Sequence, residues 1–154
     1  MPEADVDHIY DYPKGYIKDI LKSVKTIAMV GASGDKTKFS YGVLRVLHET
    51  GYEMLPVNPN PNIKDIRGLK VFHSLKEIDK PVDMVQVFRR KEELLSVAKE
   101  AIEIKAKVLW GQIGVYDDEA AETAKKAGLK VIMNRCPKIE LFRPFRKPRL
   151  DLKM

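Results

Sequence analysis

The stretch Thr26-Ile-Ala-Met-Val-Gly-Ala-Ser-Gly-Asp-Lys-Thr-Lys-Phe-Ser-Tyr-Gly42 decides the fold of this chain. It begins with a short, mainly apolar segment of strand length, continues through a loop that holds Gly31 and Gly34, and opens into a helical pattern near Ser40. A strand that leads through such a loop into a helix directs backbone N–H groups at a phosphate. We therefore predict a phosphorylated nucleotide as the ligand.

The spacing of the glycines leaves the kind of nucleotide open. Gly31-x-x-Gly34 is followed by the next glycine only at Gly42. This pattern satisfies neither the G-x-G-x-x-G fingerprint of dinucleotide-binding proteins nor the P-loop pattern. Other parts of the chain must therefore decide which nucleotide binds.

Strand and helix patterns alternate along the rest of the chain. Apolar runs of strand length occur at Thr26–Val30, Glu53–Val57, Asp83–Phe88, Ala106–Trp110 and Leu129–Met133, with a shorter run at Lys70–His73. Helical patterns separate most of them, at Ser40–Thr50, Lys91–Ile104 and Asp117–Ala127, and a further helix is expected at Lys14–Val24. This order predicts an α/β fold with a single doubly wound, mainly parallel sheet of five to six strands and helices on both faces.

Length and composition indicate one domain. Of the 154 residues, 44% are apolar and 8% aromatic, which is ordinary for a globular protein. We assign residues 1–154 to a single domain with a core at about 14–140 and tails at 1–12 and 143–154. The net charge of +6 favours an anionic ligand. Much of this excess lies in Arg143–Arg149, so a solvated tail explains it as well as nucleic acid does.

Features that the sequence lacks indicate its location and chemistry. It has no signal peptide and no apolar run near the roughly 20 residues of a membrane span, so we expect a cytoplasmic protein without membrane partners. The single cysteine, Cys136, excludes an internal disulfide and a multi-cysteine metal site, and we expect no metal. The abundance of Lys and Glu resembles that of proteins from thermophiles.

Ligands of doubly wound sheets bind in the loops that follow the carboxyl ends of the strands. In the first of these loops, Ser33 and the amides around Gly34 can donate to phosphate, while Lys36 and Lys38 supply positive charge. The alternative is a turn that uses glycine for its geometry and lysine for solubility. The neighbouring aromatic residues either pack on a flat ligand ring or cover the edge of the sheet; they are Phe39 and Tyr41.

The loops after the next two strands offer an amide and two arginines. The second strand ends in Asn58-Pro59, where an NAD site of the usual kind has an acidic residue, so NAD is disfavoured. Asn58 either walls an adenine pocket or forms a rigid turn with Pro59. Arg89 and Arg90 either clamp phosphate oxygens or pair with the two acidic residues at the start of the next helix, Glu92 and Glu93.

The last two loops contribute an amide and a thiol. Two glycines around Gln112 permit a close approach of the backbone, and its amide can recognise polar atoms of a ligand. Cys136 lies between Arg135 and Lys138. We expect its thiol near the cleft, with positive neighbours that favour thiolate. A half-buried cysteine without chemistry is the alternative.

Taken in order over about residues 25–140, these segments resemble the family of stand-alone CoA-binding domains. Its members are small Rossmann-like proteins similar to the nucleotide domain of the succinyl-CoA synthetase alpha subunit. The matching segments are Val30-Gly-Ala-Ser33, Gly51-Tyr52, Pro56-Val-Asn-Pro59, Val82-Asp83, Val87-Phe-Arg89, Ala106-Lys107, Trp110-x-Gln112-x-Gly-Val115, Glu119-Ala-Ala121, Ala127-Gly-Leu129 and Arg135-Cys136-x-Lys-x-Glu140.

The resemblance implies coenzyme A as the ligand, with its diphosphate at the first loop and its pantetheine arm along the strand ends. It places the phosphates near Gly31, the adenosine end near Asn58 and the middle of the ligand near Gln112. The family often has Asp where this chain has Asn134. The complete set of predicted CoA-binding residues is Gly31, Ala32, Ser33, Gly34, Lys36, Lys38, Ser40, Tyr41, Asn58, Pro59, Phe88, Arg89, Arg90, Gln112, Gly114, Val115, Asn134 and Cys136.

The resemblance implies a protein that binds CoA or acyl-CoA. We expect no catalytic residues, because related synthetases need a phosphohistidine and a second domain, and this chain is too short to contain that domain. The free Cys136 suggests a mixed disulfide with the CoA thiol. The alternatives are a nicotinamide-dependent oxidoreductase or an acyl-CoA enzyme that needs a partner. A nucleic-acid-binding module that uses the basic tail ranks last. An exposed edge of the sheet leaves a homodimer open.

Overall fold

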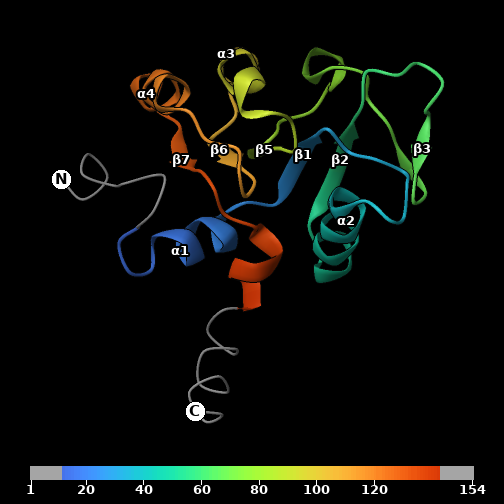
Figure 1. Cartoon of the computed structure of the whole chain (residues 1–154), viewed down its shortest axis with the longest axis horizontal. Coiled ribbons are helices and arrows are strands. Elements are labelled where there is room, and N and C mark those ends of the chain that lie inside the picture. The colour runs from blue at the N-terminus through green and yellow to red at the C-terminus, as the bar shows by residue number, and fades with distance from the viewer. Residues whose placement is uncertain (1–11, 143–154) are drawn as a thin grey trace, which may run out of the picture.

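A single parallel sheet organises the chain, and the computed structural model describes it over residues 12–142. Its five strands lie in the order β2-β1-β5-β6-β7 (Figure 1). This order confirms the predicted doubly wound, Rossmann-like α/β fold. The strands are β1 (Thr26–Val30), β2 (Glu53–Val57), β5 (Met84–Val87), β6 (Val108–Gly111) and β7 (Lys130–Ile132). The predicted tails lie outside the described residues, apart from Tyr12.

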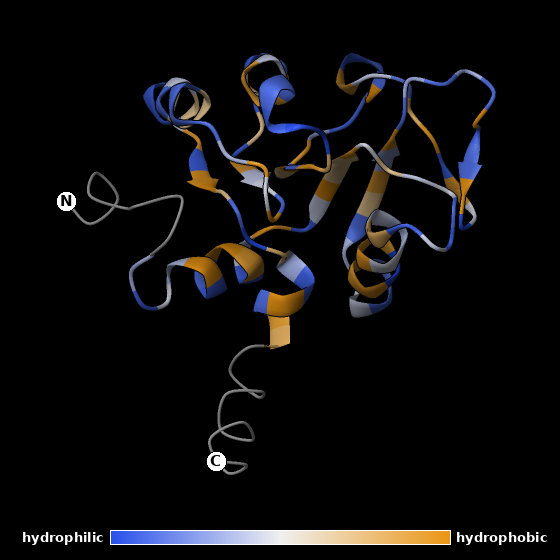
Figure 2. Cartoon of the chain, in the orientation of Figure 1, coloured by the Kyte–Doolittle hydropathy of each residue, from blue (hydrophilic) through white to orange (hydrophobic). Residues whose placement is uncertain are grey.

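Helices cover both faces of the sheet. In Figure 1, α1 and α2 lie on one face, while α3 and α4 lie on the other. Each face has its own buried apolar cluster, and the sheet strands are coloured mainly hydrophobic in Figure 2. The elements are α1 (Tyr16–Ser23), α2 (Phe39–Thr50), α3 (Leu94–Glu103) and α4 (Asp118–Lys126), with the short 3₁₀ turns η2 (Leu75–Glu77) and η3 (Lys91–Glu93).

The predicted short strand at Lys70–His73 is only partly correct. The chain forms an antiparallel hairpin of β3 (Asp65–Ile66) and β4 (Leu69–Lys70), closed by two residues with positive φ, Arg67 and Gly68. That is the backbone of a type I′ turn. From the predicted segment, only Phe72 joins the main sheet, through one parallel bridge to Val57 of β2.

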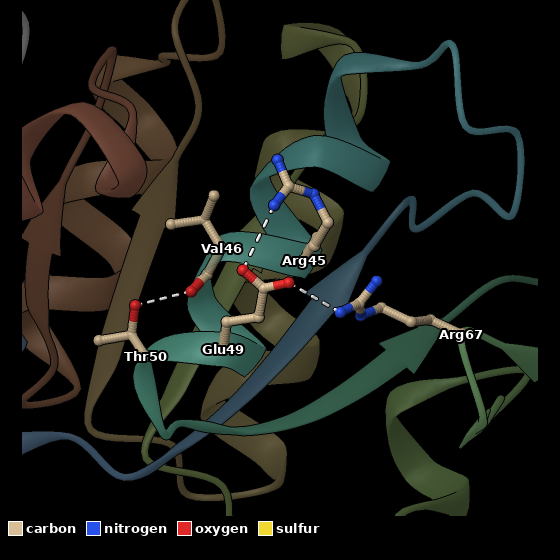
Figure 3. Close-up of polar contacts among 5 residues, drawn as sticks. All are labelled: Arg45, Val46, Glu49, Thr50 and Arg67. Atoms are coloured by element: carbon tan, nitrogen blue, oxygen red, sulfur yellow. Dashed lines mark hydrogen bonds and ion pairs between the residues drawn. The ribbon is translucent and has the colours of Figure 1, made fainter.

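Glu49 of α2 forms an ion pair with Arg67 of this hairpin (Figure 3). Its two carboxylate oxygens pair with different arginines, 3.3 Å from Nη1 of Arg45 and 2.9 Å from Nη2 of Arg67. Half of the Glu49 side chain is exposed, so each ion pair contributes at most about 1 kcal/mol. Burial of Ile66 (1% exposed) in an apolar cluster also holds the hairpin, and this side chain lies beside Gly34 of the first loop.

Two tyrosine hydroxyls cover the outer edge of β7. The Tyr16 hydroxyl donates to the carbonyl of Val131 (3.0 Å) and accepts from its backbone N–H (3.2 Å). The Tyr12 hydroxyl accepts from the backbone N–H of Met133 (2.7 Å), and the two rings stack with centroids 5.5 Å apart. The hydroxyls thus replace the hydrogen bonds that a neighbouring strand would make. A dimer formed through this edge would have to displace them.

We expect Tyr16→Phe to lower the free energy of unfolding by roughly 1–3 kcal/mol, because two backbone groups of Val131 lose their partner. Chemical denaturation followed by circular dichroism measures the change. Tyr116→Phe is the matched control: no hydrogen bond of the Tyr116 hydroxyl occurs within the described residues, and its effect should stay within about 0.5 kcal/mol. Equal losses in both variants would contradict the role given to Tyr16.

Candidate functional site

The carboxyl ends of β1 and β5 mark the place where the sheet changes direction. From β1 the chain first adds β2 on one side and later returns to add β5 on the other. Ligands of doubly wound sheets bind at such a switch point. Backbone hydrogen bonds join the loops here: Gly31 and Ala32 donate to the Val57 carbonyl (3.0 and 3.2 Å), and Gln112 donates to the Val87 carbonyl (3.2 Å).

Gly31 lies too close to the end of β5 for any side chain to fit. Its φ is +92°, and a Cβ at this position would lie 2.3 Å from the carbonyl oxygen of Phe88 and 3.1 Å from Cδ of Arg89. At Gly34, in contrast, a Cβ would meet only Ile66, at an ordinary 3.7 Å. Of the two glycines in the first loop, only the first is therefore required by the backbone.

A turn centred on Asp35 leads from this loop to α2. The Ser33 hydroxyl accepts from the backbone N–H of Asp35 (3.1 Å), and the Asp35 carboxylate accepts from the hydroxyl and backbone N–H of Thr37 (2.7 and 2.9 Å). These bonds from Thr37 hold the pKa of Asp35 below its usual range. The N-cap residue Lys38 makes no side-chain capping bond, so the first backbone N–H groups of α2, near the buried Ser40, suit an anion.

The side chains around the start of α2 separate into exposed and packed ones. Lys36 and Lys38 are exposed and make no ion pair within the described residues. Tyr41 packs against the core between α2 and the sheet, so it covers the sheet as one alternative predicted. Phe39 is 54% exposed and meets the ring of Phe88 edge-on at 6.3 Å. More than half of the Phe39 residue is therefore in contact with solvent.

The side-chain amide of Asn58 forms hydrogen bonds with the backbone of two loops. Its Nδ2 donates to the Ala32 carbonyl (2.8 Å), and its Oδ1 accepts from the backbone N–H of Asn60 (2.9 Å). The exposed Pro59 follows. This geometry matches the predicted alternative of a rigid turn, and it places the β2 loop against the first loop.

A pocket of about 510 Å³ opens at the end of β5, lined by Phe88, Arg89, Arg90 and Glu93. Glu93 bridges the two arginines: its Oε1 lies 2.7 Å from Nε and Nη2 of Arg89, and its Oε2 lies 3.1 Å from Nε of Arg90. The guanidinium of Arg89, followed by that of Arg90, holds the pKa of Glu93 below its usual range. The predicted alternative of arginine–glutamate pairing is therefore present, with Glu93 alone as the acceptor among the described residues.

Two buried glutamines lie at the ends of β5 and β6. Gln86 is 0% exposed and Gln112 is 3% exposed, and Gln86 Nε2 donates to Gln112 Oε1 (3.1 Å). The remaining polar atoms, Gln86 Oε1 and Gln112 Nε2, have no hydrogen-bond partner within residues 12–142. Such orphaned atoms are rare in native cores and call for an explanation. The sequence signal that could have found Gln86 is a polar residue inside an otherwise apolar strand.

The loop after β6 is held by its own backbone and by the loop after β7. A Cβ on Gly111 would lie 2.2 Å from the carbonyl oxygen of Val115, so glycine is needed for the loop to fold back. Val115 itself is 7% exposed. The backbone N–H of Gly114 donates to Oδ1 of Asn134 (2.7 Å). Asn134 therefore positions the neighbouring loop through an oxygen that an Asp would also provide.

The Cys136 thiol is buried, which differs from the expectation of an accessible thiol near the cleft. Cys136 is 1% exposed and belongs to the apolar cluster on the α1 and α2 face, together with Trp110 and Ile132. The chain turns back toward this face after β7, and a helical segment begins at Pro137. A small side chain at that turn is covered by its neighbours. This is closer to the predicted alternative of a half-buried cysteine without chemistry.

Within the described residues, the polar groups of this site give no metal centre. No cluster of three or more His, Cys, Asp or Glu side chains with the geometry to hold a metal occurs in residues 12–142. In the same part of the chain, no helix is long and apolar enough to cross a membrane. The site offers backbone N–H groups, lysines, arginines and amides at the carboxyl edge of a doubly wound sheet, as expected of a nucleotide-binding protein.

Comparison with known proteins identifies the class more closely. Residues 25–141 match the model of the CoA binding domain, and the chain belongs to this family. The Bacillus subtilis protein YneT is 44% identical over 82% of this chain and 92% of its own length. The structure of a hypothetical protein from Pyrococcus horikoshii is 32% identical and superposes with a TM-score of 0.79, covering 87% of this chain and 96% of that one.

A larger relative shows how the same domain occurs in an enzyme. The alpha subunit of an ADP-forming acetate–CoA ligase from Pyrococcus furiosus is 29% identical over 74% of this chain. The match spans only 28% of that subunit. The chain therefore corresponds to about a quarter of the ligase subunit.

Gly31→Ala should destabilise the fold by roughly 2–5 kcal/mol, because it forces a left-handed alanine against the Phe88 carbonyl. Gly34→Ala, the control within the same loop, should change stability by less than about 0.5 kcal/mol. Denaturant titration of the two variants and the parent gives both values. Similar stabilities for Gly31→Ala and Gly34→Ala would show that the first loop does not need its close approach to β5.

Proposed function

We propose that this protein binds coenzyme A or an acyl-CoA, without catalysing a reaction on its own. The observation that supports the proposal most directly is that the loops after β1, β2, β5 and β6 meet at one switch point, and all of them lie within the span matched by the CoA binding domain. The exposed lysines and the uncapped N-terminus of α2 add donors for phosphate at that place.

The ligand would lie along the carboxyl edge of the sheet. Its diphosphate would meet the backbone N–H groups of Ser33 and Gly34 and the start of α2, because those of Gly31 and Ala32 already donate to Val57. The ring of Phe39 would flank the adenine. The pantetheine arm would follow the strand ends toward Gln112 and Gly114. Asn58 and Asn134 act as positioning residues in this arrangement, since their side-chain amides hold the loops.

The buried glutamine pair fits this ligand. The pantetheine arm of CoA contains secondary amides, each with one carbonyl acceptor and one N–H donor. Among the described residues, Gln112 Nε2 is an unpartnered donor and Gln86 Oε1 an unpartnered acceptor on two hydrogen-bonded amides. A carbonyl of the pantetheine arm could accept from the first, and an N–H of the arm could donate to the second. Because both atoms are buried, this contact requires the surrounding loops to shift when the ligand binds.

Catalysis by this chain has little to support it. In the acetate–CoA ligase relative, the matched part is 28% of the alpha subunit. The nicotinamide alternative is disfavoured because β2 ends in Asn58, whose amide atoms hold backbone groups, where NAD sites of the usual kind have an acid for the ribose hydroxyls. The burial of Cys136 argues against a mixed disulfide, because disulfide exchange needs an accessible sulfur.

Location and assembly stay predictions from the sequence. We propose the cytoplasm as the compartment of a CoA-binding protein with this composition. A homodimer would need a surface other than the β7 edge at Val131 and Met133, because tyrosine hydroxyls occupy the hydrogen-bonding groups there.

Calorimetric titration with CoA and, separately, with NAD tests the proposed function. We expect CoA to bind at least tenfold more tightly than NAD. Cys136→Ser should bind oxidised and reduced CoA with the affinity of the parent, because the sulfur is buried. A preference for NAD would instead make the oxidoreductase the leading function. A CoA adduct that survives denaturation of the parent and is absent from Cys136→Ser would restore the disulfide.

The double variant Gln86→Met, Gln112→Met tests the amide contact. It removes two orphaned polar atoms while keeping the volume, so thermal stability without ligand should be unchanged or higher. CoA affinity should fall about thirtyfold, because roughly 1 kcal/mol is lost with each of the two hydrogen bonds to the ligand. Unchanged affinity for CoA together with a higher melting temperature would show that the pair has no part in binding.

A further inference from the structure

Glu93 occupies the guanidinium groups that a ligand phosphate at the end of β5 would use. Its Oε1 lies 2.7 Å from two nitrogens of Arg89, and its Oε2 lies 3.1 Å from Nε of Arg90. All three residues line the same pocket. Arg89 also borders the first loop, since its Cδ lies 3.1 Å from the position that a Cβ of Gly31 would take. One anion at the switch point can therefore reach both the first loop and this arginine.

Helix capping does not explain why the carboxylate lies here. Glu93 is the N-cap residue of α3, but its side chain makes no capping hydrogen bond. It turns instead toward the two arginines. The adjacent Glu92 is exposed, and it forms no ion pair within residues 12–142. The arrangement is therefore particular to Glu93 and is not a general property of the acidic start of this helix.

We propose that Glu93 is an internal competitor for the ligand's phosphate groups and so determines affinity and selectivity at this site. Carboxylate and phosphate accept the same bidentate hydrogen bonds from a guanidinium group. A multiply charged phosphate that also takes the backbone N–H groups of the first loop and α2 can displace one carboxylate. A singly charged anion gains too little to do so.

The inference rests on the proposed function only in taking CoA as the anion. Its test therefore uses two probes, CoA and inorganic pyrophosphate, each titrated by calorimetry into the parent, Glu93→Gln and Glu92→Gln. Both substitutions raise the net charge by one, so their difference isolates the contact with the arginines. Thermal unfolding of each variant checks that the fold is retained.

Glu93→Gln should bind both probes about three- to fivefold more tightly than the parent, the upper range for a partly exposed ion pair. Glu92→Gln should change either affinity by less than about twofold. In an Arg89→Ala background, the gain from Glu93→Gln should shrink, because the arginine that it releases is gone.

Equal gains in the two glutamine variants would overturn the inference, since net charge alone would explain them. Weaker binding by Glu93→Gln would also overturn it, because Glu93 would then hold the arginines in their binding geometry. If no variant binds CoA but Glu93→Gln binds pyrophosphate more tightly, the competitor stands and the CoA function fails. If neither probe binds any variant, both proposals fail.

Discussion

The contact of the Gly31 backbone with the Phe88 carbonyl is the constraint on which the site depends. A hydrogen atom in place of a side chain lets the end of β1 approach the end of β5 to a distance that no Cβ tolerates. The same turn directs the N–H groups of Gly31 and Ala32 to the Val57 carbonyl of β2. The loops after β1, β2 and β5 therefore all contact the turn at Gly31, and this turn determines where their side chains lie.

The polar residues around this point divide into two kinds. Asn58, Asp35 and Asn134 use their side-chain oxygens or amides to hold backbone groups of the loops. The lysines of the first loop are exposed and make no ion pair within the described residues, whereas the two arginines after β5 are paired with Glu93. Such a division suits a binding protein, because a first loop that is already held in place loses little conformational entropy when a ligand binds there.

Much of the fold could be predicted because its signals are local. β1 and β2 have the predicted limits, since each is a short apolar run bounded by a clear turn signal. The sequence indicates a short strand at Lys70–His73 and gives no sign of the hairpin of β3 and β4, because two-residue strands form too short a pattern and Arg67 is not a usual residue for positive φ. Arg67 and Gly68 supply the positive φ of the turn, and Arg67 also pairs with Glu49 of α2.

The parts of the site that depend on tertiary packing could not be predicted. Which glutamate meets the arginines depends on the 3₁₀ turn η3, whose phase the sequence does not reveal. Cys136 has charged neighbours in sequence and apolar neighbours in space, because the chain turns back over the core after β7. Gln86 was overlooked because its partner Gln112 is 26 residues away.

The tyrosine hydroxyls on β7 have a consequence for the solubility of the protein. Two tyrosine side chains from the segment before β1 form the hydrogen bonds that a sixth strand would form with this edge. The edge is therefore covered by a part of the chain that does not belong to the sheet. A protease that removed the chain through Tyr16 would remove none of the strands of the main sheet and none of the loops at their carboxyl ends. It would also expose the edge strand β7 with unpaired backbone N–H and C=O groups. Cleaved molecules could then aggregate by pairing with one another along this edge.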